Sequence, residues 1–109
     1  MKPNAIHHIA IICSDKDKAM EFYHEKLGLP IIRENYRPER DDWKIDLSIN
    51  STTELELFIM KDRPERVSNP EAYGLRHLAF KHNHLVNYRY ATPIRAIFTR
   101  TRIAETRIK

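Results

Sequence analysis

The sequence is poor in glycine and cysteine, and it contains no long apolar run. Two glycines and one cysteine occur among its 109 residues. It has no Gly-rich phosphate-binding loop and no nucleophile elbow. The single cysteine, Cys13, excludes an internal disulfide framework and favours a reducing cytoplasm. Since no apolar run is long enough to cross a membrane, we expect a cytoplasmic protein with no membrane partner.

The charged residues are unevenly distributed along the chain, whose net charge is +4. Residues 1–80 carry 12 Lys or Arg against 14 Asp or Glu, whereas residues 81–109 carry seven against one. A basic tail can indicate contact with a nucleic acid or an acidic surface. This tail has neither aromatic residues spaced for base stacking nor a DNA-reading motif, so we predict no nucleic-acid partner.

The spacing of apolar residues predicts an α+β fold in one domain. Helical spacing covers residues 14–28, with Ser14 as the expected N-cap and Gly28 as the expected C-terminal cap. Alternation of apolar and polar residues predicts the strands, which gives the order βαβββ followed by one more strand. The predicted strands are 5–13, 29–36, 41–50, 54–60 and 75–81. Beyond Lys81 the sequence shows neither clean helical nor clean strand periodicity.

Three otherwise apolar strands each contain one side chain that can bind a metal ion: His8, Glu56 and His77. A buried carboxylate costs several kcal/mol unless it is paired or bound to a cation, so Glu56 needs a partner. Two imidazoles and a carboxylate suit zinc, nickel, cobalt or iron(II). The alternative is that the histidines are hydrogen-bonded structural residues and the glutamate faces solvent. Both interpretations stay open, because the three residues are scattered along the chain.

Several stretches resemble the vicinal oxygen chelate superfamily (glyoxalase, bleomycin resistance and dioxygenase proteins), and in particular its small bacterial glyoxalase I-like members. The resemblance covers about three-quarters of the chain. Its most specific stretch joins a long irregular loop to the strand that follows it. The matching stretches are "IHHIAII", "FYHEKLGLP", "YRPERDDWKIDLSI", "ELELF" and "RPERVSNPEAYGLRHLAF".

The resemblance implies a βαβββ module with a curved mixed sheet that holds one divalent metal ion. Its ligands would be His8, Glu56 and His77, with His8 on the metal-bearing face and His7 on the opposite face. The implied reaction is that of a lactoylglutathione lyase, a carbon-sulfur lyase that acts on the hemithioacetal of a 2-oxoaldehyde and a thiol. Glu56 could also serve as the catalytic base. A single module leaves open strand edges, so we expect a homodimer.

The chain departs from the family pattern after about residue 81. Residues 1–80 match one module and the strand after it, whereas residues 81–109 form a basic tail that we interpret as an incomplete or rearranged second module. The family's final glutamate has no counterpart, since Glu105 is the only acid after Glu71 and its surroundings do not match. We therefore expect a truncated or altered chain, whose lyase activity could be impaired.

Two alternatives to the lyase remain open. One is a non-catalytic binding protein like the bleomycin-resistance members, in which a dimer cleft holds an aromatic or cationic small molecule. The stacking candidates would be Trp43, Phe58 and Tyr36. The other alternative is a defective truncated chain.

Overall fold

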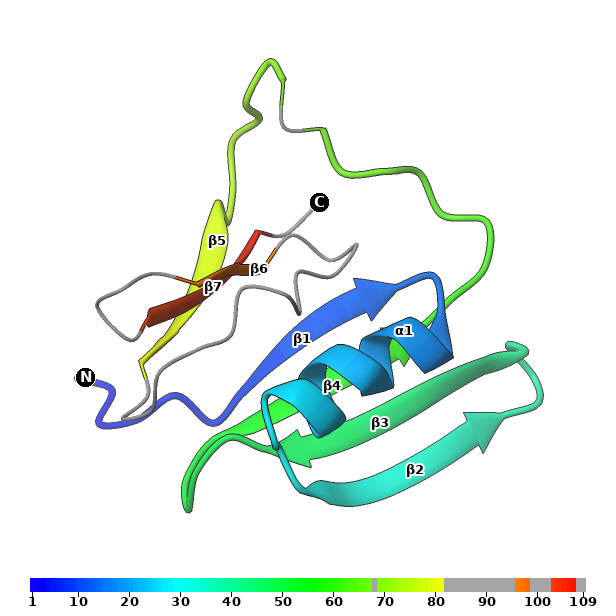
Figure 1. The fold of residues 1–109 in the computed structure, drawn as a ribbon, viewed down its shortest axis with the longest axis horizontal. Helices are drawn as coiled ribbons and strands as arrows, with labels where there is room; N and C mark the ends of the chain where they lie inside the picture. Colours follow the sequence, from blue (N-terminus) through cyan, green and yellow to red (C-terminus); the bar gives the residue numbers. More distant parts are fainter. Residues whose placement is uncertain (68, 82–95, 99–102, 108–109) are drawn as a thin grey trace. The chain divides into compact units, whose positions relative to one another are not determined.

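The computed structural model describes residues 1–67, 69–81, 96–98 and 103–107. The chain forms two compact units, Met1–Arg63 and Pro64–Lys109. The first unit confirms the predicted βαβββ order (Figure 1). Within the described part of the chain, no helix is long and apolar enough to cross a membrane. The elements of the first unit are β1 (His8–Cys13), α1 (Lys16–Met20), η1 (Glu21–Lys26), β2 (Ile31–Arg37), β3 (Asp42–Ser48) and β4 (Glu54–Ile59).

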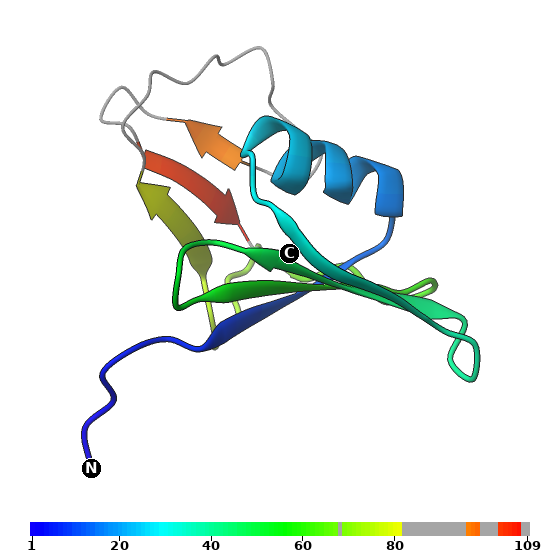
Figure 2. The same cartoon turned by 90° about the horizontal axis from the view of Figure 1, so that it is seen from below.

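The first unit is built on a four-stranded sheet with the order β1-β4-β3-β2. β1 and β4 run parallel, while β4 pairs antiparallel with β3, and β3 pairs antiparallel with β2. The helical segment between β1 and β2 lies on one face of this sheet (Figure 2). The mixed sheet with its single helical segment confirms the α+β prediction.

The helix begins and ends with local hydrogen bonds that the sequence indicated only in part. Its N-cap is Asp15, not the predicted Ser14, and the Asp15 side chain accepts a hydrogen bond from the backbone N–H of Lys18 at 3.0 Å. The second half is a π-helix, in which the Leu27 N–H donates to the Phe22 carbonyl at 2.9 Å. Gly28 has a positive φ of 74°, which confirms the predicted C-terminal cap.

The core of the first unit lies between the sheet and this helix. Successive strand residues point to opposite faces, so one face of each strand can be wholly apolar. The alternation predicted for β3 and β4 is confirmed. The buried apolar residues are Ile11 and Cys13 on β1, Ile45 and Leu47 on β3, Leu55, Leu57 and Ile59 on β4, and Ala19, Phe22 and Tyr23 on the helix.

The second unit contains a three-stranded antiparallel sheet with the order β5-β7-β6. β5 (His77–Lys81) confirms the fifth strand, two residues shorter at its start than the sequence predicted. β6 (Ala96–Phe98) and β7 (Ile103–Arg107) were not predicted. The rest of the segment after Lys81 lies outside the described residues.

Candidate metal-binding face

The face of the first-unit sheet away from the helix, called here the open face, carries a row of charged side chains. Cross-strand partners share a face, and Asp46 of β3 is the partner of both Glu56 on β4 and Arg33 on β2. Lys44 lies two residues before Asp46 and therefore shares this face, as does His8 at the start of β1. The open face thus brings together groups from all four strands.

His8 and Glu56, two of the predicted ligands, meet on this face. The His8 Nε2 atom lies 3.2 Å from Glu56 Oε2, and the two side chains are 49% and 16% exposed. The pair is diagonal, because the register places Glu54 opposite His8 and Ala10 opposite Glu56. The small side chain of Ala10 leaves the diagonal free. Solvent can therefore reach the imidazole while the carboxylate is largely covered.

His7 contacts His8 through the Nδ1 atom of each ring. The two Nδ1 atoms are 2.9 Å apart, so one ring donates the hydrogen bond and the other accepts it. The rings meet edge to face, with centroids 5.1 Å apart. The expectation that they point to opposite faces is wrong, since β1 begins at His8 and strand alternation does not extend to His7. With Nδ1 of His8 engaged, Nε2 is the nitrogen that faces Glu56.

Lys44 holds the second oxygen of Glu56. Its ammonium Nζ lies 3.0 Å from Glu56 Oε1 and 3.7 Å from Asp46 Oδ2. The contact with Glu56 is the main cause that raises the pKa of Lys44. Lys44 is therefore charged at neutral pH, and it fixes the Glu56 carboxylate with Oε2 turned to His8.

Asp46 is the second carboxylate in contact with the Lys44 ammonium. Its side chain is fully buried, and Oδ2 accepts a hydrogen bond from Arg33 Nε at 2.8 Å. Arg33 also donates to Glu54 Oε1 at 2.6 Å. Asp46 Oδ1 has no hydrogen-bond partner among the described residues. The sequence did not predict a site role for Lys44, Asp46 or Arg33. The polar half of the alternating β3 pattern was the signal that pointed to this face.

The His8–Glu56 pair fits part of a divalent metal site. Two ligands that each lie about 2.1 Å from one ion are about 3.0 Å apart at an octahedral angle and about 3.4 Å apart at a tetrahedral angle. The observed 3.2 Å lies between these values. Imidazole nitrogen and carboxylate oxygen are both suitable donors for zinc, nickel, cobalt and iron(II).

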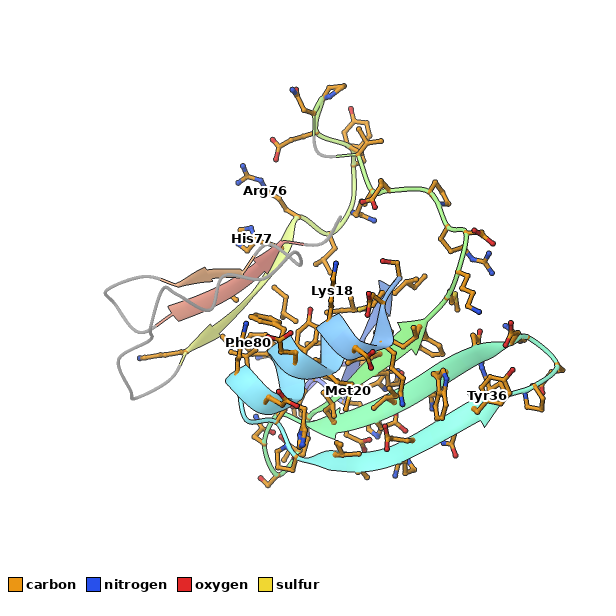
Figure 3. The ribbon with its side chains drawn as sticks, turned by 45° about the vertical axis from the view of Figure 1, so that its right-hand side comes forward. Lys18, Met20, Tyr36, Arg76, His77 and Phe80 are labelled. Atoms are coloured by element: carbon orange, nitrogen blue, oxygen red, sulfur yellow. The ribbon has the colours of Figure 1, made fainter. Side chains whose placement is uncertain are left out.

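The described residues contain no group of three or more His, Cys, Asp or Glu side chains placed to hold a metal ion. His77 is exposed and lies at the start of β5 in the second unit (Figure 3). The first unit therefore brings together two of the three predicted ligands.

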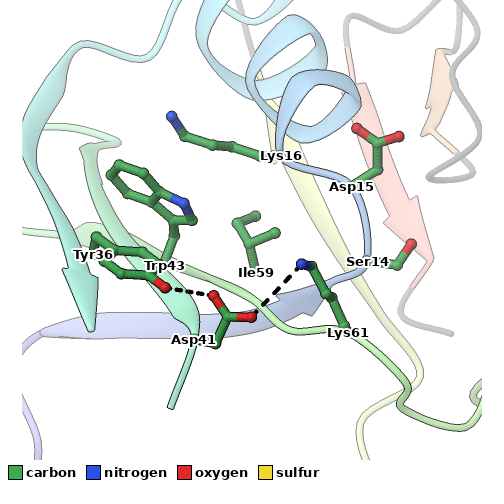
Figure 4. Close-up of a pocket in the computed structure, with 8 residues that line it drawn as sticks. All are labelled: Ser14, Asp15, Lys16, Tyr36, Asp41, Trp43, Ile59 and Lys61. Atoms are coloured by element: carbon green, nitrogen blue, oxygen red, sulfur yellow. Dashed lines mark hydrogen bonds and ion pairs between the residues drawn. The ribbon is translucent and has the colours of Figure 1, made fainter. Parts of the chain in front are cut away.

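A separate cavity of about 300 Å³ opens on the helix side of the first-unit sheet (Figure 4). Its aromatic wall is Trp43 with Tyr36, whose ring centroids are 5.4 Å apart. The Lys16 ammonium lies 4.0 Å from the Trp43 ring centroid, as a cation–π contact. The lining residues are Ser14, Asp15, Lys16, Tyr36, Asp41, Trp43, Ile59 and Lys61.

A hydrogen bond from the Tyr36 hydroxyl to Asp41 orders the rim of this cavity. It raises the pKa of Tyr36 and lowers the pKa of Asp41. Phe58 takes no part, because its register partner is Lys44 and it lies on the open face, with the Arg37 guanidinium 5.2 Å from its ring centroid. The predicted stacking group of Trp43, Tyr36 and Phe58 is therefore divided between the two faces.

Residues 5–87 match the family model described as "Glyoxalase/Bleomycin resistance protein/Dioxygenase superfamily". The chain is 58% identical over 76 residues to the uncharacterized protein YwkD of Bacillus subtilis, covering 70% of this chain and 59% of YwkD. It is 51% identical over 75 residues to the uncharacterized protein YaeR of Escherichia coli, covering 69% and 58% of the two chains. The chain thus spans less than two thirds of the length of these curated relatives.

Two solved structures are also similar. One is a glyoxalase family protein from Enterococcus faecalis, with a TM-score of 0.67 and 52% identity, covering 74% of this chain and 64% of that one. The other is SMU.1112c, with a TM-score of 0.69 and 49% identity, covering 77% and 68% of the two chains. At this identity the likeness extends to sequence as well as fold.

Proposed function

Because the chain belongs to the glyoxalase/bleomycin resistance protein/dioxygenase superfamily, we propose that it is a metal-dependent lyase of the glyoxalase type. The superfamily includes metal-dependent enzymes. The proposed substrate is the hemithioacetal formed by a 2-oxoaldehyde and a thiol such as glutathione, as for a lactoylglutathione lyase. The cytoplasm, where such thiols are abundant and reduced, is the proposed location.

The observation that carries this proposal is the 3.2 Å approach of His8 Nε2 to Glu56 Oε2 on the open face. In the proposal His8, Glu56 and His77 hold one divalent ion, which is zinc, nickel, cobalt or iron(II). The assignment of His77 rests on the sequence resemblance alone. This imidazole–carboxylate pair lies on a sheet face that no described helix covers, so an ion and a small substrate could reach it.

The chain's own residues would hold the metal ion and transfer protons. A bound divalent ion would supply a Lewis acid that stabilises negative charge on the substrate oxygens. Glu56 would take a proton from one substrate carbon and return it to the neighbouring carbon, as a general base and then a general acid. Lys44 would keep the Glu56 carboxylate in place during this transfer, since it holds Oε1 at 3.0 Å.

Elemental analysis and a lyase assay test this function together. Wild type should hold nickel, zinc, cobalt or iron close to one ion per chain. His8→Ala, His77→Ala and Glu56→Gln should lose it, whereas the exposed Glu25→Gln should behave as wild type. No lyase rate with zinc, nickel or cobalt would contradict the reaction, even if metal is bound.

We also propose a homodimer, which many proteins of this superfamily form. β1 and β2 are the edge strands of the first-unit sheet, and an unpaired strand edge favours association with another chain. Light scattering at micromolar concentration should give twice the mass of one chain. A monomer mass would contradict the dimer and leave the metal assignment in place.

The cavity beside Trp43 favours a second candidate function, the non-catalytic binding of a small molecule. Its aromatic wall lies on the helix side of the sheet, so this function would not need His8 or Glu56. Trp43 is the single tryptophan and reports directly on this cavity. Saturable quenching of its fluorescence by an aromatic ligand in the presence of a chelator would support binding, and unchanged fluorescence would count against it.

A further inference from the structure

The cavity on the helix side of the first-unit sheet is lined by two carboxylates, and both are already engaged. Asp15 accepts a hydrogen bond from the Lys18 backbone N–H at 3.0 Å and so caps the helix. Asp41 accepts the hydrogen bond of the Tyr36 hydroxyl, and its other oxygen lies 3.7 Å from the Lys61 ammonium. Each carboxylate therefore has a partner within the protein, and a ligand cation is not needed to supply one.

The two ammonium groups that line the cavity are paired more loosely. The Lys16 Nζ atom lies 3.7 Å from Glu34 Oε1, and the Lys61 Nζ atom lies 3.7 Å from Asp41 Oδ2. Both distances exceed the range of an N–H···O hydrogen bond, so the ion pairs leave ammonium donors unfilled. The Lys61 side chain is also 75% exposed, which leaves it free to turn toward a ligand.

Trp43 adds a donor that is directed into the cavity. Its indole N–H points from the aromatic wall toward the interior (Figure 4). Within the described part of the chain this N–H has no hydrogen-bond acceptor, and the Ser14 hydroxyl at the rim has no partner either. An indole nitrogen can only donate. The unfilled hydrogen-bonding capacity of the cavity is thus mainly that of donors, and acceptor oxygens of a ligand would fill it.

The apolar part of the lining is suited to a flat ring. Ile59 is buried, at 7% exposure, and the Trp43 and Tyr36 rings stand beside it at an interplanar angle of 58°. The volume of about 300 Å³ lies at the lower end of the range for ligand pockets. All of the lining residues belong to the first unit, so the cavity is complete within it.

We propose that this cavity binds a small aromatic carboxylate. The ring would lie against Ile59 and Tyr36, while the carboxylate accepts a hydrogen bond from the Trp43 indole N–H and pairs with the Lys61 ammonium, as a charge-assisted contact. The Lys16 ammonium keeps its place 4.0 Å from the Trp43 ring centroid, so the ligand meets the N–H edge of the indole. The inference rests on the second candidate function, the non-catalytic binding of a small molecule, and adds the class of ligand.

Equilibrium dialysis of the full chain against probes of similar shape and different charge tests the ligand class. The probes are 1-naphthoate, the neutral 1-naphthamide and the cationic 1-naphthylmethylammonium. A chelator is present throughout, so that a metal ion on the open face cannot bind the carboxylate. 1-Naphthoate should bind at least ~10-fold more tightly than either of the other two, because only its charged oxygens match the unfilled donors.

Nuclear magnetic resonance locates the bound probe. Trp43 is the single tryptophan, so its indole N–H gives one identifiable resonance. Titration with 1-naphthoate should move this resonance downfield and to saturation, since the N–H would then donate to a carboxylate.

Substitutions of the two proposed contacts complete the test. Lys61→Gln should weaken 1-naphthoate binding about 3-fold or more. Lys18→Gln is the matched control, because Lys18 is an exposed lysine that does not line the cavity. Trp43→Phe keeps an aromatic ring and removes the N–H, which should weaken binding about 5-fold. Circular dichroism checks that each variant is folded, and the exposed Lys61 keeps the test available if Trp43→Phe is not.

The outcomes separate this inference from the binding function on which it rests. If none of the probes binds, both are wrong. If the amide or the ammonium probe binds as tightly as 1-naphthoate, the binding function stands and the ligand class is overturned. If 1-naphthoate binds while the Trp43 resonance stays in place and Lys61→Gln behaves as Lys18→Gln, the carboxylate site is not in this cavity and the inference is also overturned.

Discussion

The imidazole of His8 reaches the carboxylate of Glu56 across a diagonal of the sheet, with 3.2 Å between Nε2 and Oε2. The contact depends on the residue between them in the register, which is Ala10. A longer side chain at that position would fill the space through which the two groups approach each other. The contact between His8 and Glu56 therefore depends on the register of β1 and β4 as well as on the two side chains.

Ala10→Leu should weaken metal binding by about 10-fold without unfolding the chain, because it disturbs the ligand pair indirectly. Ala10 is exposed, so the added methyl groups need not enter the core. Calorimetric titration with Zn²⁺ measures the effect. Ile12→Leu, on the same strand face but beyond the pair, is the control and should bind as wild type. Equal affinity for Ala10→Leu would contradict the proposed use of this diagonal.

The ion pair between the buried Asp42 and the half-buried Arg37 should make the free energy of unfolding depend on pH. Arg37 donates to both carboxylate oxygens at 2.6 and 2.8 Å, and it is the main cause that lowers the pKa of Asp42 below 3.8. A lowered folded-state pKa adds stability above the unfolded-state pKa, and this contribution is lost as the pH falls through the folded-state value.

Asp42→Asn should therefore lower the melting temperature most above about pH 5, with the difference from wild type shrinking below about pH 4. Melting curves between these pH values check it. Glu25→Gln, which is exposed, should show no such trend. A difference that stays constant with pH would mean that the carboxylate charge of Asp42 does not stabilise the fold.

Two aliphatic residues, Leu57 and Ile12, lie on opposite faces of the first-unit sheet and should differ in their contribution to stability. Leu57 is fully buried beneath the helix, whereas Ile12 is 57% exposed on the open face. Leu57→Ala should lower the free energy of unfolding by about 2–5 kcal/mol, because it leaves a cavity in a packed core. Ile12→Ala should change it by no more than about 0.5 kcal/mol. Urea unfolding measures both, and a large loss for Ile12→Ala would indicate that something covers the open face in solution.

Much of the fold of the first unit could be predicted because it follows from local patterns. Apolar alternation identified both core strands, and the positive φ of Gly28 agrees with its predicted capping role. The N-cap was misassigned because Ser14 and Asp15 are adjacent residues that can both cap a helix. The π-helical turn has no comparable sequence signal.

The candidate site could be predicted only in part, since it depends on pairing between strands. His8 and Glu56 stood out as polar residues in apolar strands, and the structure brings them together. The contact of Lys44 with Glu56 follows from the antiparallel register of β3 and β4, which no single strand reveals. The pairing of β5 with β7 is equally non-local, and no pattern within the single strands predicted it.

Cys13 should be nearly unreactive in the folded protein. It is buried at the end of β1, and burial raises its pKa to about 12. The thiolate is the reactive form, so at pH 8 almost all of the native thiol is protonated as well as covered. Reaction with a disulfide reagent should be at least ~100-fold slower in buffer than in denaturant.

The reaction rate of the buried Cys13 thiol can be compared with that of an exposed cysteine at the neighbouring position. A chain carrying Ile12→Cys together with Cys13→Ala should react rapidly when folded, because position 12 faces solvent on the open face. If wild type reacts as fast as this variant, the strand that carries both Cys13 and His8 opens readily. The His8–Glu56 diagonal would then not be held in a fixed register, and the metal-ligand assignment would lose its structural basis.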